Sequence, residues 1–209
     1  MNMIAQLSET DLFHCKRTAV ISKCLAKLDG LGEPETTYIE QAALVHDIGK
    51  SAIPPEILNK PGPLTAEELS IVQTHTNIGR TLLKGTQNLM PTAATVAYQH
   101  HERLDGSGYH GLCGSDIHPH ARLVAVADVF DALISKRSYK DPWNIGHACS
   151  YLELQAGETL DDHYVKQLVT HLGPIIYALE RMRENGEMRI HTRNALRRRR
   201  GGNHYAFTG

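Results

Sequence analysis

The adjacent residues His46 and Asp47 are the part of this sequence that most directly suggests chemistry. An aspartate carboxylate can bridge two cations, and the neighbouring imidazole can bind one of them. Lys50 follows three residues later and could place a positive charge beside a bound phosphate. An isolated His-Asp pair is usually surface or helix-capping chemistry, so this pair indicates a metal site only if other donors accompany it.

Other donors do accompany the pair. The chain has 13 histidines, and histidine is the commonest metal ligand among side chains. Five expected helices carry candidate ligands, and the full set is His14, His46, Asp47, His75, His100, His101 and Asp128. Two-metal hydrolytic sites need several nitrogen and oxygen donors around cations about 3.5–4 Å apart, and helical bundles build such sites from facing side chains. The pattern therefore favours a binuclear hydrolytic site.

The elements that position these donors are expected to be helices. Apolar residues recur with helical spacing, Thr65 and Glu68 form a capping-box pattern, and prolines stand at several helix starts. No segment shows the alternation typical of strands, so we predict an all-α, compact bundle of about seven or eight helices. The expected helices end near residues 28, 49, 83, 101 and 133, and three more lie near 144–155, 162–171 and 174–184.

Two proline- or glycine-rich segments are expected to be loops. Residues 51–63 contain four prolines and a glycine, and residues 102–118 contain four glycines. A loop as long as the second one inside a compact domain is usually functional.

Composition and charge limit the class of protein to which the chain can belong. The chain has 209 residues, of which 41% are hydrophobic and only 6% aromatic, which suits one helical domain. The net charge is −1, yet the segment from 181 to 209 has eight arginines against two glutamates. We therefore predict a catalytic domain over residues 1–184 and a basic, flexible tail over 185–209, with no DNA partner.

The cysteines and the absence of targeting signals indicate a cytoplasmic protein. Cys15, Cys24, Cys113 and Cys149 form no Cys-x-x-Cys pair, so we expect free, mostly buried thiols in a reducing compartment. The sequence shows no signal peptide. It also has no apolar run approaching the roughly 20 residues that span a bilayer, so no membrane span is expected.

Two sets of residues carry a resemblance to a known family. His14, the pair His46-Asp47 and Asp128 resemble the H…HD…D pattern of the HD phosphohydrolase superfamily. The segment 100–109, HHERLDGSGY, resembles the HHExxDGxGYP motif of the HD-GYP family, which are bacterial cyclic di-GMP phosphodiesterases. The match covers roughly residues 11–170. It implies an HD-type helical bundle.

The resemblance also implies roles for particular residues. The seven donors named above match the family's metal ligands, with Asp47 bridging two divalent ions, iron or manganese. Asp47 and Lys50 would be catalytic, and Lys50 would lie near the phosphate. The expected substrate-binding residues are Lys50, Arg137, Gly106, Gly108 and Tyr109.

The chain departs from the family pattern at two positions. His110 stands where the motif has its last proline, which leaves the loop freer because proline would fix φ. Thr10 stands where some members have a glutamate that binds a third metal, so we expect two metals here.

The expected function is hydrolysis of cyclic di-GMP, or a related cyclic dinucleotide, to the linear dinucleotide and on to GMP. Two alternatives stay open. One is a catalytically weak signalling module that acts by binding nucleotide or protein, with a diguanylate cyclase domain as a candidate partner. The other is an HD phosphohydrolase acting on another nucleotide. The sequence does not determine the oligomeric state.

Overall fold

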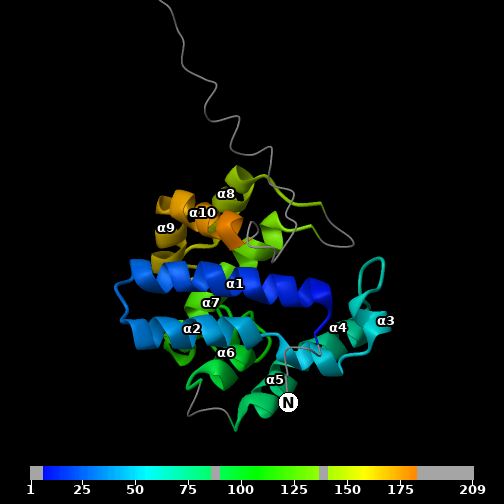
Figure 1. The fold of residues 1–209 in the computed structure, drawn as a ribbon. Coiled ribbons are helices and arrows are strands. Elements are labelled where there is room, and N and C mark those ends of the chain that lie inside the picture. The colour runs from blue at the N-terminus through cyan, green and yellow to red at the C-terminus, as the bar shows by residue number, and fades with distance from the viewer. Residues whose placement is uncertain (1–6, 86–89, 137–140, 183–209) are drawn as a thin grey trace, which may run out of the picture.

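Helices make up nearly all of the regular structure (Figure 1). The computed structural model describes residues 7–85, 90–136 and 141–182, and within them the only β-type pairing is an isolated bridge between Ala156 and Leu160. The all-α prediction is confirmed. The helices are α1 (Glu9–Leu28), α2 (Glu33–Val45), α3 (Pro55–Leu58), α4 (Ala66–Gln73), α5 (His75–Leu83), α6 (Ala93–Gln99), α7 (Pro119–Ile134), α8 (Ile145–Gln155), α9 (Asp162–Thr170) and α10 (Leu172–Met182), with short 3-10 helices η2 (Ile48–Ala52) and η3 (Gly114–Asp116).

Helix α7 forms the centre of the core. It packs against α1, α2, α6, α8 and α9, and Pro119 in its first turn has the φ that a helix start requires. Most of its residues are buried, as expected for a helix that is apolar on nearly all sides. Asp128 and Asp131 are buried in this helix. Because buried carboxylates need partners, these two aspartates require cations or hydrogen-bond donors inside the core.

Helices α1 and α2 run antiparallel, side by side, across the face shown in Figure 1. Ser8 caps α1 by accepting a hydrogen bond from the Asp11 backbone N–H at 3.1 Å. Helix α2 ends at Val45, earlier than the sequence predicts, and η2 follows it after His46 and Asp47. The pair therefore lies at a junction between two helices.

The helix predicted to run from Thr65 to about Leu83 is divided at Thr74. The predicted capping box is present, with the Thr65 N–H donating to Glu68 Oε2 at 2.7 Å and the Glu68 N–H donating to Thr65 Oγ1 at 3.2 Å. The Thr74 hydroxyl donates to the Ile71 carbonyl at 2.6 Å, which competes with the helical hydrogen bonds. The break makes His75 the first residue of α5.

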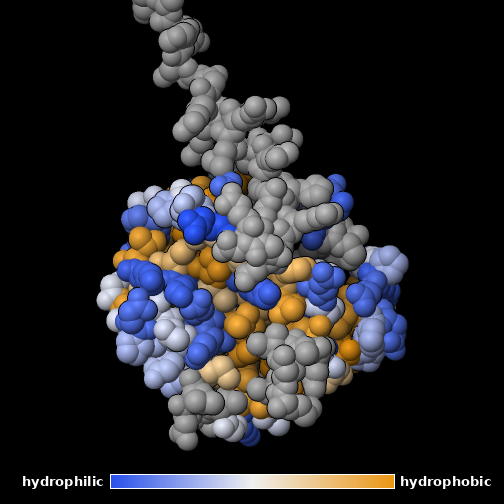
Figure 2. Space-filling view, viewed as in Figure 1, coloured by the Kyte–Doolittle hydropathy of each residue, from blue (hydrophilic) through white to orange (hydrophobic). Residues whose placement is uncertain are grey.

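The loop predicted between 51 and 63 contains the one-turn helix α3, and residues 102–118 form an irregular segment apart from η3. The predicted tail, 185–209, lies outside the described residues, so the boundary at 184 stays a prediction. Figure 2 shows hydrophilic side chains over α3 and over the linked ends of α1 and α2, with hydrophobic residues between them. Among the described residues, no helix is long and apolar enough to cross a membrane.

Candidate metal centre

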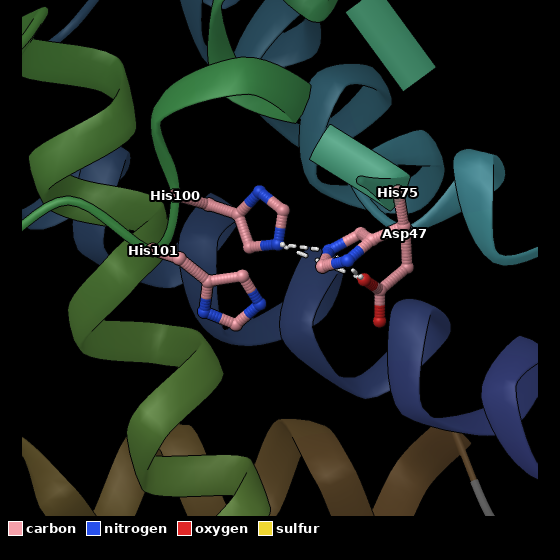
Figure 3. Close-up of side chains that lie close together, drawn as sticks. All are labelled: Asp47, His75, His100 and His101. Atoms are coloured by element: carbon pink, nitrogen blue, oxygen red, sulfur yellow. Dashed lines mark hydrogen bonds and ion pairs between the residues drawn. The ribbon is translucent and has the colours of Figure 1, made fainter. Parts of the chain in front are cut away.

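The structure brings all seven predicted metal ligands together in two groups. Each group has ligand atoms within 4.8 Å of one another, and all the residues are buried except His101, which is partly exposed. The residues come from α1, the α2–η2 junction, α5, the two positions directly after α6, and the middle of α7. The first group is His14, His46 and Asp128, and the second is Asp47, His75, His100 and His101 (Figure 3).

Asp47 lies between the two groups and turns one oxygen toward each. Its Oδ1 is 3.2 Å from His75 Nε2 and 3.6 Å from His100 Nε2. Its Oδ2 is 3.4 Å from His46 Nε2 and 3.8 Å from His14 Nε2. This division of the two oxygens is what a carboxylate needs in order to bridge two cations.

Four of the histidines have the same ring nitrogen aimed at the centre. In each, Nδ1 lies at hydrogen-bond distance from an oxygen outside the cluster of donors. A carbonyl or a carboxylate oxygen can only accept, so Nδ1 carries the proton and Nε2 faces inward. The pairs are His14 with Asp131 Oδ2 (2.7 Å), His46 with the Ala43 carbonyl (2.7 Å), His75 with the Val72 carbonyl (2.7 Å), and His100 with the Val96 and Ala97 carbonyls (3.1 Å each).

The donors fit a metal because several are left without a partner. Within the described residues, His46 Nε2 and Asp47 Oδ1 are buried and have no hydrogen-bond partner. The Nε2 atoms of His75 and His100 face each other at 3.4 Å, and an imidazole whose single proton is on Nδ1 presents only an acceptor at Nε2. Each unsatisfied buried group costs about 1–3 kcal/mol. Divalent cations would satisfy all these atoms at once.

The two groups differ in how readily they bind protons. Burial by itself would lower the pKa of His14, but hydrogen bonds to Asp128 and Asp131 outweigh it and raise the pKa to about 9. Burial lowers the pKa of His100 to about 4 despite the nearby Asp47, and burial with His100 beside it also lowers the pKa of His101. At neutral pH, His100 is therefore in the neutral form that binds metal.

His14 is held in place by a buried ion pair on its outer side. Asp131 accepts from His14 Nδ1 and is itself held by Arg17, whose Nη2 donates to Asp131 Oδ2 at 2.9 Å. On its inner side, His14 Nε2 is 2.9 Å from Asp128 Oδ1. A carboxylate behind a metal-ligating histidine fixes the ring and raises its basicity.

Lys50 lies at the edge of the cluster. Its ammonium donates to Asp47 Oδ2 at 2.6 Å and is 3.8 Å from Asp11 Oδ1. Burial would lower the pKa of Lys50, but Asp47 and Asp11 outweigh it and raise the pKa. The lysine therefore keeps its charge beside the bridging candidate, where a phosphate could also meet it.

The predicted signature loop closes around a buried glutamate. Glu102 is 2% exposed. Its Oε1 accepts from the His110 N–H at 2.9 Å and its Oε2 from the Leu112 N–H at 2.8 Å.

Gly106 has φ +81°, which favours glycine. A Cβ on Gly108 would lie 2.5 Å from the Glu102 Cα. Both glycines therefore have a structural reason to be there, and a role in substrate binding stays a prediction.

Tyr109 lies next to the second donor group. Its ring centroid is 4.5 Å from that of His101 and 6.3 Å from that of His75. The loop thus brings an aromatic ring to the candidate metal ligands. Arg137, the other predicted nucleotide-binding residue, lies outside the described residues.

His110, which replaces the motif proline, ties the loop to two helices. Its ring stacks on Tyr98 of α6 with centroids 4.0 Å apart and planes 15° apart. Its Nε2 is 2.9 Å from Thr76 Oγ1 of α5, and the Arg80 guanidinium lies over the Tyr98 ring, 4.5 Å from its centroid. The residue that was expected to leave the loop freer therefore attaches it to α5 and α6.

One further residue, which the sequence did not suggest as a ligand, lies beside the candidate site. Cys15 was predicted to be a free, buried thiol, which it is. Its sulfur, however, also lies within 4.8 Å of ligand atoms of His46 and Asp47. The one signal in the sequence is its position directly after His14.

Comparisons with known proteins identify the relatives of this chain. The family model described as HD domain matches residues 1–164. The chain is 46% identical over 156 residues to the cyclic di-GMP phosphodiesterase response regulator RpfG of Xanthomonas campestris pv. campestris, which covers 74% of this chain and 41% of that protein. It is 44% identical over 160 residues to the 3′3′-cGAMP-specific phosphodiesterase 2 of Vibrio cholerae, covering 76% of this chain and 31% of that protein. The chain thus spans less than half the length of either relative.

A solved structure shares the fold. Bd1817, an HDG"Y"P protein from Bdellovibrio bacteriovorus, superimposes with a TM-score of 0.63 at 24% identity, covering 76% of this chain and 51% of that one. At this identity the likeness concerns the fold alone. It confirms the predicted HD-type helical bundle.

Proposed function

The chain belongs to the HD-domain family, and from this premise we propose that it is a metal-dependent phosphodiesterase for cyclic di-GMP or a related cyclic dinucleotide. The observation that carries the proposal is Asp47, whose two oxygens face two separate donor groups. Relatives named as phosphodiesterases for cyclic di-GMP and for 3′3′-cGAMP support a cyclic dinucleotide as the substrate. They do not decide whether the second base of that dinucleotide is guanine or adenine.

Two divalent ions would be held, one by each donor group, with Asp47 between them. Iron or manganese suits imidazole and carboxylate ligands, so the donor set agrees with the family expectation. When bound, such ions polarise phosphoryl oxygens and make a nearby water molecule more acidic.

The residues of the chain have separate tasks in the hydrolysis. The reaction adds one water across a P–O3′ bond: the water oxygen bonds to phosphorus, and the 3′ oxygen leaves and takes a proton. This opens the ring to the linear dinucleotide, and a second hydrolysis would yield the mononucleotide. Lys50 holds positive charge where negative charge grows on the phosphoryl oxygens. Tyr109 lies where a nucleotide could pack against its ring, and Arg137 is proposed to contact a phosphate.

A second candidate function is a binding module that signals through nucleotide or protein contacts, with a diguanylate cyclase domain as the proposed partner. The observation that favours it is His110, because the tip of the signature loop is built differently from the family motif. The abundance of unsatisfied metal donors favours the enzyme.

The test combines metal analysis with an assay. Protein purified without oxygen is analysed for iron and manganese and then incubated with cyclic di-GMP, 3′3′-cGAMP and cyclic di-AMP. We expect two metals per chain and turnover of at least one substrate, both lost in Asp47→Ala. The control is Asp162→Ala, which removes a surface carboxylate paired with Lys166. Two metals per chain with no turnover of any substrate would leave the binding module as the better explanation.

A further inference from the structure

Cys15 is a buried sulfur beside the candidate metal centre that the proposed mechanism does not use. It lies on α1 directly after His14, and its exposed fraction is 0%. Its Sγ, a ring nitrogen of His46 and a carboxylate oxygen of Asp47 all lie within 4.8 Å of one another. These three residues form a third group of potential ligands, which shares His46 with the first group and Asp47 with the second.

A second observation indicates that this group faces a cation. The Nδ1 of His46 is occupied by the Ala43 carbonyl, so Nε2 is the ring nitrogen that is left to bind a ligand. That Nε2 is buried without a hydrogen-bond partner among the described residues, and it lies 3.4 Å from Asp47 Oδ2. The sulfur thus adjoins His46, whose inward-facing ring nitrogen is an unsatisfied donor for a metal ion.

We propose that Cys15 is a sulfur ligand to the metal ion bound by His46 and Asp47. The proposal rests on the metal centre of the proposed function and adds a soft donor to a site otherwise made of nitrogen and oxygen. Thiolate ligands favour iron, cobalt and zinc, whereas carboxylates suit manganese. Cys15 would therefore shift the preference of this site from manganese toward iron.

The competing explanation is that Cys15 only fills space. A free cysteine often behaves as a small hydrophobic residue in a core, and α1 packs closely against α2 and α7 here. Packing alone predicts that serine or alanine at this position changes stability and leaves the metal spectrum and the metal preference unchanged. Coordination predicts that both change.

The test uses cobalt as the probe in the full chain, loaded without oxygen and with bound cobalt counted by metal analysis. Sulfur bonded to cobalt(II) gives a charge-transfer band in the near ultraviolet that imidazole and carboxylate ligands do not give. We expect this band in the unaltered protein, its loss in Cys15→Ser and Cys15→Ala, and its retention in Cys24→Ser. Cys24 is a matched control because it is on the same helix and lies outside the three groups of ligands.

Competition binding gives a second readout. We expect Cys15→Ser to weaken cobalt binding by roughly 10-fold or more, the scale seen when groups that support a metal ligand are lost, and to change manganese binding much less. Alanine covers the case in which a buried serine hydroxyl prevents folding, and circular dichroism checks both variants.

Each outcome has a distinct meaning. Bound cobalt with no band, or with a band that survives in both Cys15 variants, overturns the sulfur ligand and leaves the proposed phosphodiesterase intact. A protein that binds neither cobalt nor iron nor manganese overturns both. The band without turnover of any cyclic dinucleotide supports the sulfur ligand and contradicts the enzyme.

Discussion

Asp47 and Glu102 are both buried carboxylates, 1% and 2% exposed, but their surroundings differ. Each oxygen of Glu102 accepts a backbone N–H, from His110 and from Leu112. Asp47 has an oxygen without a hydrogen-bond partner among the described residues, and several ring nitrogens face it. Burial alone therefore does not distinguish a structural carboxylate from a metal ligand. An oxygen that is left without an internal donor, such as Asp47 Oδ1, distinguishes the candidate metal ligand.

The largest effect is expected from Asp47→Asn, which keeps the shape of the side chain and removes its charge. Loss of a group that merely supports a ligand lowers metal affinity about 10–100-fold. Loss of a bridging ligand should therefore lower both metal affinity and turnover by more than about 100-fold. Metal titration and the phosphodiesterase assay check this. Full metal content and activity in the variant would contradict the role assigned to Asp47.

Metal removal should destabilise the protein through the same unsatisfied donors. A ligand that binds only the folded state at 100 times its dissociation constant contributes about 2.7 kcal/mol. We expect a chelator to lower the free energy of unfolding by about this amount, measured by urea denaturation at fixed pH. Asp47→Asn is the control, because a variant with weak metal binding should respond much less. An equal response in both proteins would mean that the chelator acts elsewhere.

Glu102→Gln tests the structural carboxylate of the comparison and should lower stability without removing metal. Glutamine replaces one acceptor with an NH₂ group that faces a backbone N–H, and an unsatisfied buried group costs about 1–3 kcal/mol. We expect lower stability with two metals still bound. Glu153→Gln on the exposed side of α8 is the matched control and should leave stability unchanged. Loss of metal in Glu102→Gln, with the free energy of unfolding of the metal-free protein unchanged, would show that Glu102 belongs to the metal centre.

The smallest effect is expected from His110→Phe. Phenylalanine preserves the stack on Tyr98 and loses the contact with Thr76, so we expect a loss of about 0.5–1.5 kcal/mol. His110→Ala should cost more because it also removes the stack. If both variants are as stable as the unaltered protein, His110 does not hold the loop.

Much of the fold could be predicted from local patterns. The starts of α4 and α7 follow from Thr65 with Glu68 and from Pro119, because these residues satisfy or fit the first turn of a helix whatever packs against it. The break at Thr74 was not predicted, since helical spacing of apolar residues continues through it. It depends on the Thr74 hydroxyl and on the position that His75 takes beside Asp47.

The sequence by itself determined seven candidate metal ligands, because residue type sets donor chemistry and the motif of 100–109 is long and specific. Only the tertiary structure decided how they are shared: Asp47 turns one oxygen to each group, backbone carbonyls set the tautomers of His46, His75 and His100, and the Cys15 sulfur reaches the same cluster. These features depend on distances between helices that are remote in the sequence, and no local pattern encodes such distances.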